Sequence, residues 1–477
     1  RPWVVVKNVN GRDIYNYYGN YDWWHTVFNN HQPSQSHSVN VQGGNEKLNF
    51  MLSGNYYAKD GIMKINTDKF KSYNFRSKIN AQIFPFLKIS NNTSYYDSSY
   101  SYYGREGGGN GNFTYVSVHA LPAYAPMNPD GTATYNTLKN NYSIGDGIFA
   151  ALIDGGMRGK NGVHEFTTTT GLQLDITKYL KVNADYTYSF DITDDWYRST
   201  VAEYSIEPGV LEEVPNYNTD QLKKEMTFDP MHVVNVYANY NQQFGKHSVS
   251  ATAGINYENK KHSRMFASRN DLISDELNDL DLATGDMLVE GGAYDYALFG
   301  FFFRANYDYN DRYLLEVSGR YDGTSRFKKG MRYGFFPSFS AGWRMSEEPF
   351  FESAKDVVNN LKVRVSYGSL GNQAVNSSNA NYYPYITTMG MALSSWLIDG
   401  QRTQNVSAPN PVIDNLTWEK ATTTNVGLDL SFLSNRLNFS ADAYVRNTTD
   451  MLVPGMTLPG VFGASSPQQN AGDLRTK

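Results

Sequence analysis

The chain of 477 residues contains no cysteine. Disulfide bonds, catalytic thiolates and cysteine-ligated zinc sites are therefore excluded. No run of about 18 apolar residues occurs, which excludes a membrane-spanning helix. Charged residues make up only 19% of the sequence and the net charge is −5, so the chain lacks the positive charge expected of a nucleic-acid-binding protein.

Aromatic residues, by contrast, are abundant. They make up 15% of the chain, with 37 Tyr and 26 Phe, although the mean hydropathy is −0.53. A transmembrane β-barrel produces this combination, because its lipid-facing apolar side chains alternate with polar side chains that face the lumen.

Residues 304–344 show this alternation most clearly. Their pattern predicts three strands, joined first by a tight turn and then by a polar loop that contains Gly. In the middle strand, one face carries Tyr313, Leu315, Val317, Gly319 and Tyr321, and the other carries Leu314, Glu316, Ser318 and Arg320. Successive side chains of a strand point to opposite faces, so this segment forms a sheet with one apolar and one polar side.

The alternation recurs at residues 180–190, 249–257, 426–432 and 437–445. Short connections, such as 244–246 and 310–312, alternate with long polar ones at 99–163, 191–231, 259–294 and 369–418. Membrane barrels have this arrangement because one rim carries short turns and the other carries long loops. We therefore predict an all-β fold, part of a large antiparallel transmembrane β-barrel with long extracellular loops and about a dozen strands between Leu48 and Arg446. A soluble β-propeller or β-sandwich is the alternative, and it requires an interior apolar set on every strand.

A set of residues in and around this segment forms a recognisable motif: Arg320, Tyr321, Asp322, Gly323, Ser325, Arg326, Phe327, Gly334, Phe336, Pro337 and Trp343. With these residues, and with segments 37–47, 346–351, 418–420 and 470–473, the chain resembles the SusC/RagA family. Members of that family are TonB-dependent outer-membrane transporters of Bacteroidetes-type Gram-negative bacteria.

The resemblance implies a complete barrel of about 22 strands filled by an N-terminal plug. It also implies a SusD-like surface lipoprotein as a lid, a higher-order assembly of the two proteins, and energy from the proton gradient delivered through TonB. No cofactor is expected. We expect residues 1–477 to be one incomplete barrel domain within a longer polypeptide, without the plug, the TonB box and the last strands.

Aromatic clusters in the loops are the candidate contacts for substrate or lid: Trp196, Tyr197, Tyr102, Tyr103 and Trp396. Exposed rings stack on sugar faces and anchor protein interfaces. The alternative is structural, as a membrane-interface girdle and as packing within the loops. Tyr21, Trp23 and Trp24 are the first cluster, and we expect them in the girdle.

The motif residues themselves are expected to be structural. Arg320 lies on the polar face, so we expect it to point into the lumen and to pair with a carboxylate of a neighbouring strand or of the plug.

Neither a metal centre nor catalysis is predicted. The acidic residues between Asp271 and Asp286 do not match a calcium-binding loop, and the eight histidines have no metal-ligand spacing. We expect the acidic segment to be a solvated loop.

The predicted function is active import of oligosaccharides across the outer membrane, together with a SusD-like lipoprotein. Import of oligopeptides within the same family, and a passive porin or adhesin on the same barrel, are the alternatives. The net charge argues against nucleic acid as a partner.

Overall fold

The structure is a computed structural model that describes residues 3–135, 147–374, 382–409, 411–464 and 466–477. Its main strands are β3 (Ser34–Gly44), β4 (Leu48–Asp60), β5 (Lys69–Phe84), β6 (Leu87–Tyr103), β7 (Arg158–Asp175), β8 (Leu180–Ser199), β11 (Gln221–Phe244), β12 (His247–Asn270), β13 (Met287–Tyr309), β14 (Tyr313–Thr324), β15 (Tyr333–Arg344), β16 (Val358–Asn372), β19 (Glu419–Phe432), β20 (Leu437–Pro454) and β21 (Gln468–Thr476).

Shorter elements lie in the connections. They are the hairpins β1 (Val4–Val9) with β2 (Arg12–Tyr17), β9 (Glu203–Glu207) with β10 (Val210–Glu213), and β17 (Met391–Ile398) with β18 (Gln401–Val406). The α-helices are α1 (Trp23–Val27), α2 (Gly109–His119) and α3 (Ile148–Asp154), and the 3-10 helices are η2 (Leu280–Leu282), η3 (Met345–Glu347), η4 (Pro349–Ala354) and η5 (Gly460–Phe462).

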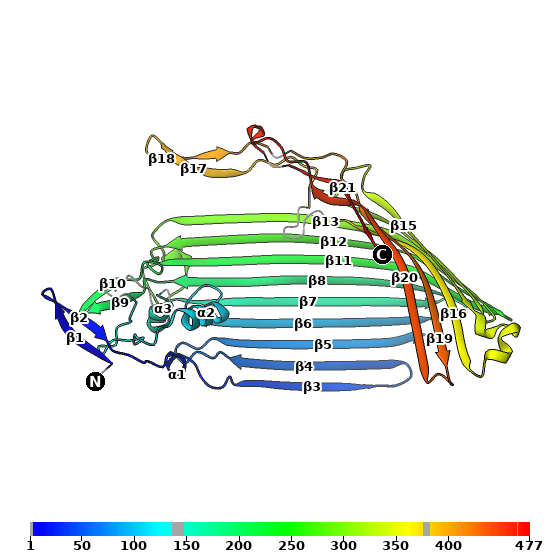
Figure 1. Cartoon of the computed structure of the whole chain (residues 1–477), viewed down its shortest axis with the longest axis horizontal. Helices are drawn as coiled ribbons and strands as arrows, with labels where there is room; N and C mark the ends of the chain where they lie inside the picture. The colour runs from blue at the N-terminus through cyan, green and yellow to red at the C-terminus, as the bar shows by residue number, and fades with distance from the viewer. Residues whose placement is uncertain (1–2, 136–146, 375–381, 410, 465) are drawn as a thin grey trace.

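The main strands form a single antiparallel sheet. Within the described ranges it has 15 strands in the order β21-β20-β19-β16-β15-β14-β13-β12-β11-β8-β7-β6-β5-β4-β3 (Figure 1). Consecutive main strands are neighbours, so the sheet is a meander, the topology of an up-and-down barrel wall. This arrangement confirms the predicted antiparallel barrel fold.

The two ends of this wall differ. At the turn end, most connections are a few residues long and several use left-handed backbone conformations, as at Asn310 (φ 55°), Asp311 (φ 56°) and Gly245 (φ 60°). The connection from β15 to β16 is longer and carries η3 and η4. Asn and Asp tolerate this conformation better than most residues, and Gly adopts it without a steric penalty. At the loop end, the α-helices and the β1–β2 and β9–β10 hairpins gather beyond strands β3–β13 (Figure 1). Among the helices of the described residues, none is both long and apolar enough for a membrane span.

The two faces of the wall follow the predicted alternation. In the register of β14 with β15, Leu315 lies opposite Ala341, Val317 opposite Phe339 and Tyr321 opposite Phe335. Cross-strand partners lie on the same face, so apolar side chains form a continuous surface on one side. Val317 is 44% exposed there, which is the exposure expected of a side chain that meets lipid.

A polar cluster interrupts this apolar face on β6 and β7. The Asn91 Nδ2 donates to the Thr168 Oγ1 (3.2 Å) and to the Thr170 Oγ1 (3.1 Å), and the Thr93 Oγ1 donates to the Asn91 Oδ1 (2.9 Å). Mutual hydrogen bonds lower the cost of placing polar side chains against lipid. The apolar face is therefore less uniform than the sequence pattern predicts.

Several strands are longer than predicted. Residues 191–231 and 259–294 were expected to be loops, but β8 continues to Ser199, β11 begins at Gln221, and β12 continues to Asn270. A strand needs only about ten residues to cross the membrane, and β11 has 24. Beyond the lipid, water reaches both faces, so the backbone pairing continues while the alternation of side chains fades.

The assignment of β14 side chains to a lipid face and a polar face predicts how much a charged residue costs on each face. Val317→Arg should destabilise the folded protein by about 2–4 kcal/mol, because a guanidinium on the lipid side loses its hydration. Ser318→Arg, on the polar face one residue away, is the matched control and should cost much less. Urea unfolding of the full-length protein in lipid vesicles measures both, and equal costs would contradict the assigned faces.

Candidate functional site at the loop end of the wall

A small hydrophobic core gives one part of the loop end a defined structure. It joins α1 to residues of α2 and α3, and it includes Trp23, Phe28 and Phe149. Trp23 is only 7% exposed, and its Nε1 donates to the carbonyl oxygens of Leu121 and Tyr124, both at 3.0 Å. The prediction that Trp23 belongs to a membrane girdle is therefore wrong, because the ring closes a core within the loops.

Tyr102 and Tyr197 are also buried. Their rings stack with centroids 6.3 Å apart, and the Tyr197 hydroxyl donates to the carbonyl oxygen of Gly104 (2.9 Å). Burial raises the pKa of both tyrosines. With 2% and 8% exposure, respectively, neither ring offers a free face to a ligand or a lid, contrary to the expectation for these residues.

The other three candidate aromatic residues differ in exposure. Tyr103 packs against the core around Trp23, and Trp196 packs against a small cluster around Leu222. Trp396, on β17, is 59% exposed. Of the five candidates, Trp396 is the one whose ring is open to a partner or ligand, and it lies on a hairpin that projects away from the large sheet (Figure 1).

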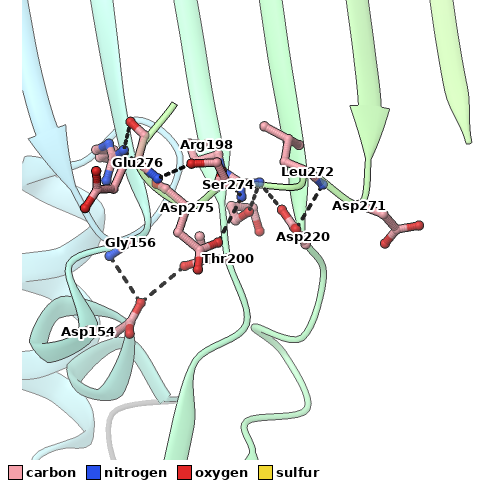
Figure 2. Close-up of polar contacts among 12 residues, drawn as sticks. Asp154, Gly156, Arg198, Thr200, Asp220, Asp271, Leu272, Ser274, Asp275 and Glu276 are labelled. Carbon is pink, nitrogen blue, oxygen red and sulfur yellow. Dashed lines mark hydrogen bonds and ion pairs between the residues drawn. The ribbon is translucent and has the colours of Figure 1, made fainter. Parts of the chain in front are cut away.

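Arg198 holds the loops after β8 and β12 together. Its side chain is fully buried, and its guanidinium forms ion pairs with Asp220 and with the Asp275 carboxylate, the latter at 3.3 Å (Figure 2). Burial lowers the pKa of Arg198, and the negative charge of Asp275 opposes that shift. The second oxygen of Asp220 accepts from the backbone N–H of Leu272 (3.1 Å), so one carboxylate ties two loops to one arginine.

Arg158 strengthens the same attachment. It lies directly opposite Arg198 in the register of β7 with β8, and its Nη2 donates to the carbonyl oxygens of Asp275 (2.9 Å) and Glu276 (3.0 Å). The acidic segment 271–286 is thus fastened to the wall by two arginines. In the described part of the chain, no group of three or more His, Asp or Glu side chains is arranged to hold a metal ion.

Ser325, from the middle of the sequence motif, completes the unpaired edge of β13. Pairing with β14 begins at Leu298, so residues 287–297 extend beyond β14. The Ser325 N–H donates to the Ala297 carbonyl (3.0 Å), and the Ala297 N–H donates to the Ser325 Oγ (2.9 Å). Ser325 therefore satisfies backbone groups that β14 no longer reaches.

The following motif residues fill a core. Phe327 is fully buried with Phe336, Leu416 and Trp418. A Cβ at Gly334 would lie 2.5 Å from the Phe336 ring, so only glycine fits there. This core attaches the β14–β15 connection to the start of β19.

Four other motif residues support the packing and pairing of β14 and β15. Tyr321 stacks on Tyr333 (5.2 Å), and a Cβ at Gly323 would lie 2.4 Å from the Tyr333 ring. Pro337 lies just outside the part of β15 that pairs with β16, and the Trp343 Nε1 donates to a carboxylate oxygen of Glu348 (3.0 Å). A proline is tolerated where a ladder ends, because it has no N–H to contribute.

Within the described residues, Arg320 pairs on its own strand. Its Nε and Nη2 donate to the two carboxylate oxygens of Asp322, at 2.9 and 2.8 Å. Residues two apart on a strand lie on the same face, roughly 7 Å apart, which an arginine side chain spans. The expectation of a partner on a neighbouring strand was therefore wrong, and both members of the observed pair belong to the motif.

Arg326 leads into an aromatic cluster at the loop end of β12 and β13. Its guanidinium lies over the rings of Tyr296 (5.0 Å) and Tyr382 (4.4 Å). Tyr382 also stacks on Tyr294 (4.0 Å), which stacks on His262 (4.5 Å). Tyr294 and Tyr296 alternate with outward residues of β13, so both lie on the polar face, as Arg304 does.

Comparison with known proteins shows the family of the chain. The family model for the β-barrel of TonB-dependent receptor-like proteins matches residues 130–477. The chain belongs to the TonB-dependent receptor family. Members are outer-membrane proteins of Gram-negative bacteria, so the turn end of this wall is periplasmic and the loop end is extracellular.

Curated relatives support the resemblance to the SusC/RagA type. TonB-dependent receptor P3 of Formosa agariphila is 26% identical over 471 residues, which cover 96% of this chain and 44% of that protein. TonB-dependent receptor SusC of Bacteroides thetaiotaomicron is 36% identical over 177 residues, covering 37% of this chain and 17% of that protein. The chain thus spans less than half the length of these relatives. The relatives are receptors rather than enzymes.

A solved structure supports the fold. The RagAB peptide transporter matches with a TM-score of 0.76 and 21% identity, over 96% of this chain and 48% of that chain. The predicted resemblance to the SusC/RagA family is therefore confirmed.

Sequence reasoning missed Arg198, Arg158 and the tyrosines of β13. Arg198 follows the alternating part of β8 and Arg158 precedes that of β7, and only the register places them side by side. The spacing of Tyr294 and Tyr296 at i and i+2 was the available signal for a shared face.

The contacts of Arg198 predict that its replacement causes a local loss of structure. Arg198→Ala should weaken the closure of segment 271–286 by about 3 kcal/mol, because Asp220 remains partly buried without its counter-charge. The backbone amide of Leu272 should then exchange hydrogen roughly a hundredfold faster, as measured by mass spectrometry on the full-length protein.

Lys223→Ala is the control for that experiment. Lys223 forms an ion pair of 2.7 Å with Glu106, and neither side chain is buried, with 32% and 55% exposure, respectively. Exposed pairs contribute less than about 1 kcal/mol, so the exchange rate should change little. An equal effect of the two variants would contradict the role assigned to the burial of Arg198.

Proposed function

We propose that the complete protein is a TonB-dependent active importer of the SusC/RagA type, and that it works with a surface lipoprotein. The observation that carries the proposal is the 15-stranded wall with short periplasmic turns and structured extracellular loops, in a chain that belongs to the TonB-dependent receptor family. Two curated relatives are named SusC and TonB-dependent receptor P3, and they come from Bacteroides and Formosa.

We propose oligosaccharides as the substrate class. The rings of Tyr294 and Tyr296, on the polar face of β13, support this choice, since sugar rings stack on aromatic side chains. Oligopeptides are the second candidate, and the similarity of fold to a structure named as the RagAB peptide transporter favours them. Both candidates place the substrate on the polar face, which in the complete barrel lines the lumen.

Energy coupling tests the proposal against a passive porin or an adhesin. Deletion of the gene should abolish uptake of fluorescently labelled oligosaccharide by whole cells, and deletion of TonB should abolish it to the same degree. An uncoupler that collapses the proton gradient should have the same effect. Uptake that continues without TonB would favour the porin, and binding without uptake would favour the adhesin.

The exposed ring of Trp396 predicts a contact with the lipoprotein. Trp396→Ala should weaken recovery of the lipoprotein with the purified receptor, because buried Trp residues at interfaces often contribute about 2 kcal/mol or more. Trp3→Ala is a control of similar exposure, 51%, beside a different hairpin. Equal recovery with the Trp396 variant and the wild type would remove this residue from the interface.

A further inference from the structure

The aromatic cluster of β13 contains a space beside the unpaired edge of this strand. Tyr294 and Tyr296 project from the same face, roughly 7 Å apart along the strand. His262, the partner of Tyr294 on β12, stacks on one face of the Tyr294 ring (16°, 4.5 Å), so the other face points toward the side where β14 no longer pairs. A flat ring fits on that side, against the faces of both tyrosines.

Tyr382 occupies that space. Its ring is nearly parallel to Tyr294 (15°, centroids 4.0 Å apart) and to Tyr296 (6°, 5.4 Å). Tyr382 therefore lies against the faces of both rings, on the side away from His262. Arg326 lies over the same ring at 4.4 Å.

The walls of the space are built into the sheet, whereas the ring that fills it is not. Tyr294 and Tyr296 belong to β13, and His262, which supports Tyr294 from behind, belongs to β12. Tyr382 comes from the connection between β16 and β19, which also carries the β17–β18 hairpin. Its neighbour Tyr383 is attached to the β13 edge, where its hydroxyl donates to the Asp295 carboxylate (2.5 Å).

Hydrogen-bonding groups lie next to the rings of this cluster. Glu258 accepts from the Tyr296 hydroxyl (2.8 Å), and Asp229 contacts His262 (2.5 Å) and Lys260 (3.3 Å). Burial, followed by the neighbouring Tyr382, raises the pKa of Tyr294 to about 12. Flat faces beside carboxylates and an arginine suit a ligand that combines a ring face with hydroxyl or amide groups.

We propose that the space against the ring faces of Tyr294 and Tyr296, at the unpaired edge of β13, is a ring-binding subsite of the transport path, which the receptor's own Tyr382 fills until a ring of the substrate replaces it. The proposal rests on the proposed import function for its substrate. The shared ligand chemistry is a flat ring face, and it comes either from a pyranose or from an aromatic side chain of a peptide.

Emptying the space tests the proposal directly. Tyr382→Ala in the full-length receptor should create a site for p-cresol, the free equivalent of a tyrosine side chain, and calorimetry in detergent should detect its binding. It should also bind a ring-bearing substrate roughly 5- to 30-fold more tightly than the wild type, because two stacking contacts no longer compete.

Two probes distinguish the sources of the ring. Maltohexaose presents pyranose faces, and an octapeptide with one Trp presents an aromatic face; the same peptide with Ala at that position lacks a ring. A gain for maltohexaose alone identifies a sugar subsite, and a gain for the Trp peptide but not the Ala peptide identifies a peptide subsite. Either gain supports the subsite.

Matched variants separate the subsite from other effects. Tyr385→Ala, in the same connection but outside the space, should leave binding of all probes unchanged. Adding Tyr294→Ala to the Tyr382 variant removes the ring on which Tyr382 stacks most closely (4.0 Å) and should abolish the gain. The heat-modifiable migration of the folded barrel on gels checks that each variant is folded.

Failure of p-cresol to bind the Tyr382 variant would overturn the proposal, as would the absence of any gain for both ring-bearing probes. These binding measurements use the purified receptor and need no TonB. If uptake by cells proves independent of TonB, the import function is refuted, but the result for the subsite is unchanged.

Discussion

The structure depends on one constraint: in lipid, every backbone N–H and C=O must find a partner within the protein. A meander of antiparallel strands meets this demand by pairing each main strand with its neighbours in the chain. The same constraint continues past the membrane, where β13 extends beyond β14 and loses its partner on one side. Ser325 and Tyr383 take over that role, and both come from connections between strands.

This use of side chains to complete a strand edge gives the motif its physical meaning. Ser325 bonds the backbone of β13, Arg326 covers the tyrosine rings beside it, and Phe327 is buried in the next core. Three consecutive residues thus attach one extracellular connection to the end of β13 and to the core that precedes β19. The motif organises the extracellular end of the wall, and the membrane-crossing part of the strands needs only the alternation of polar and apolar residues.

The extracellular loops are held in two different ways. Segment 271–286 is fixed by buried charge, since Arg198 is enclosed and tied to Asp220 and Asp275. The connection that carries Tyr382 is held by stacked rings and by Arg326. Removing one partner of a buried ion pair is costly, whereas a stacked ring can be exchanged for another ring at little cost. The first attachment suits a permanent support, and the second suits a contact that a ligand replaces.

The sequence by itself determined the fold class, the facing of the strands and the family, because alternation with a period of two and a local motif are written in consecutive residues. It did not determine the strand ends, since pairing continues where alternation fades. Nor did it show which aromatic residues are free: Trp23, Tyr102 and Tyr197 are buried and Trp396 is exposed, although all lie in similar polar segments. Burial depends on contacts between distant residues, as does the meeting of Tyr294 with Tyr382, and only the tertiary structure decides these contacts.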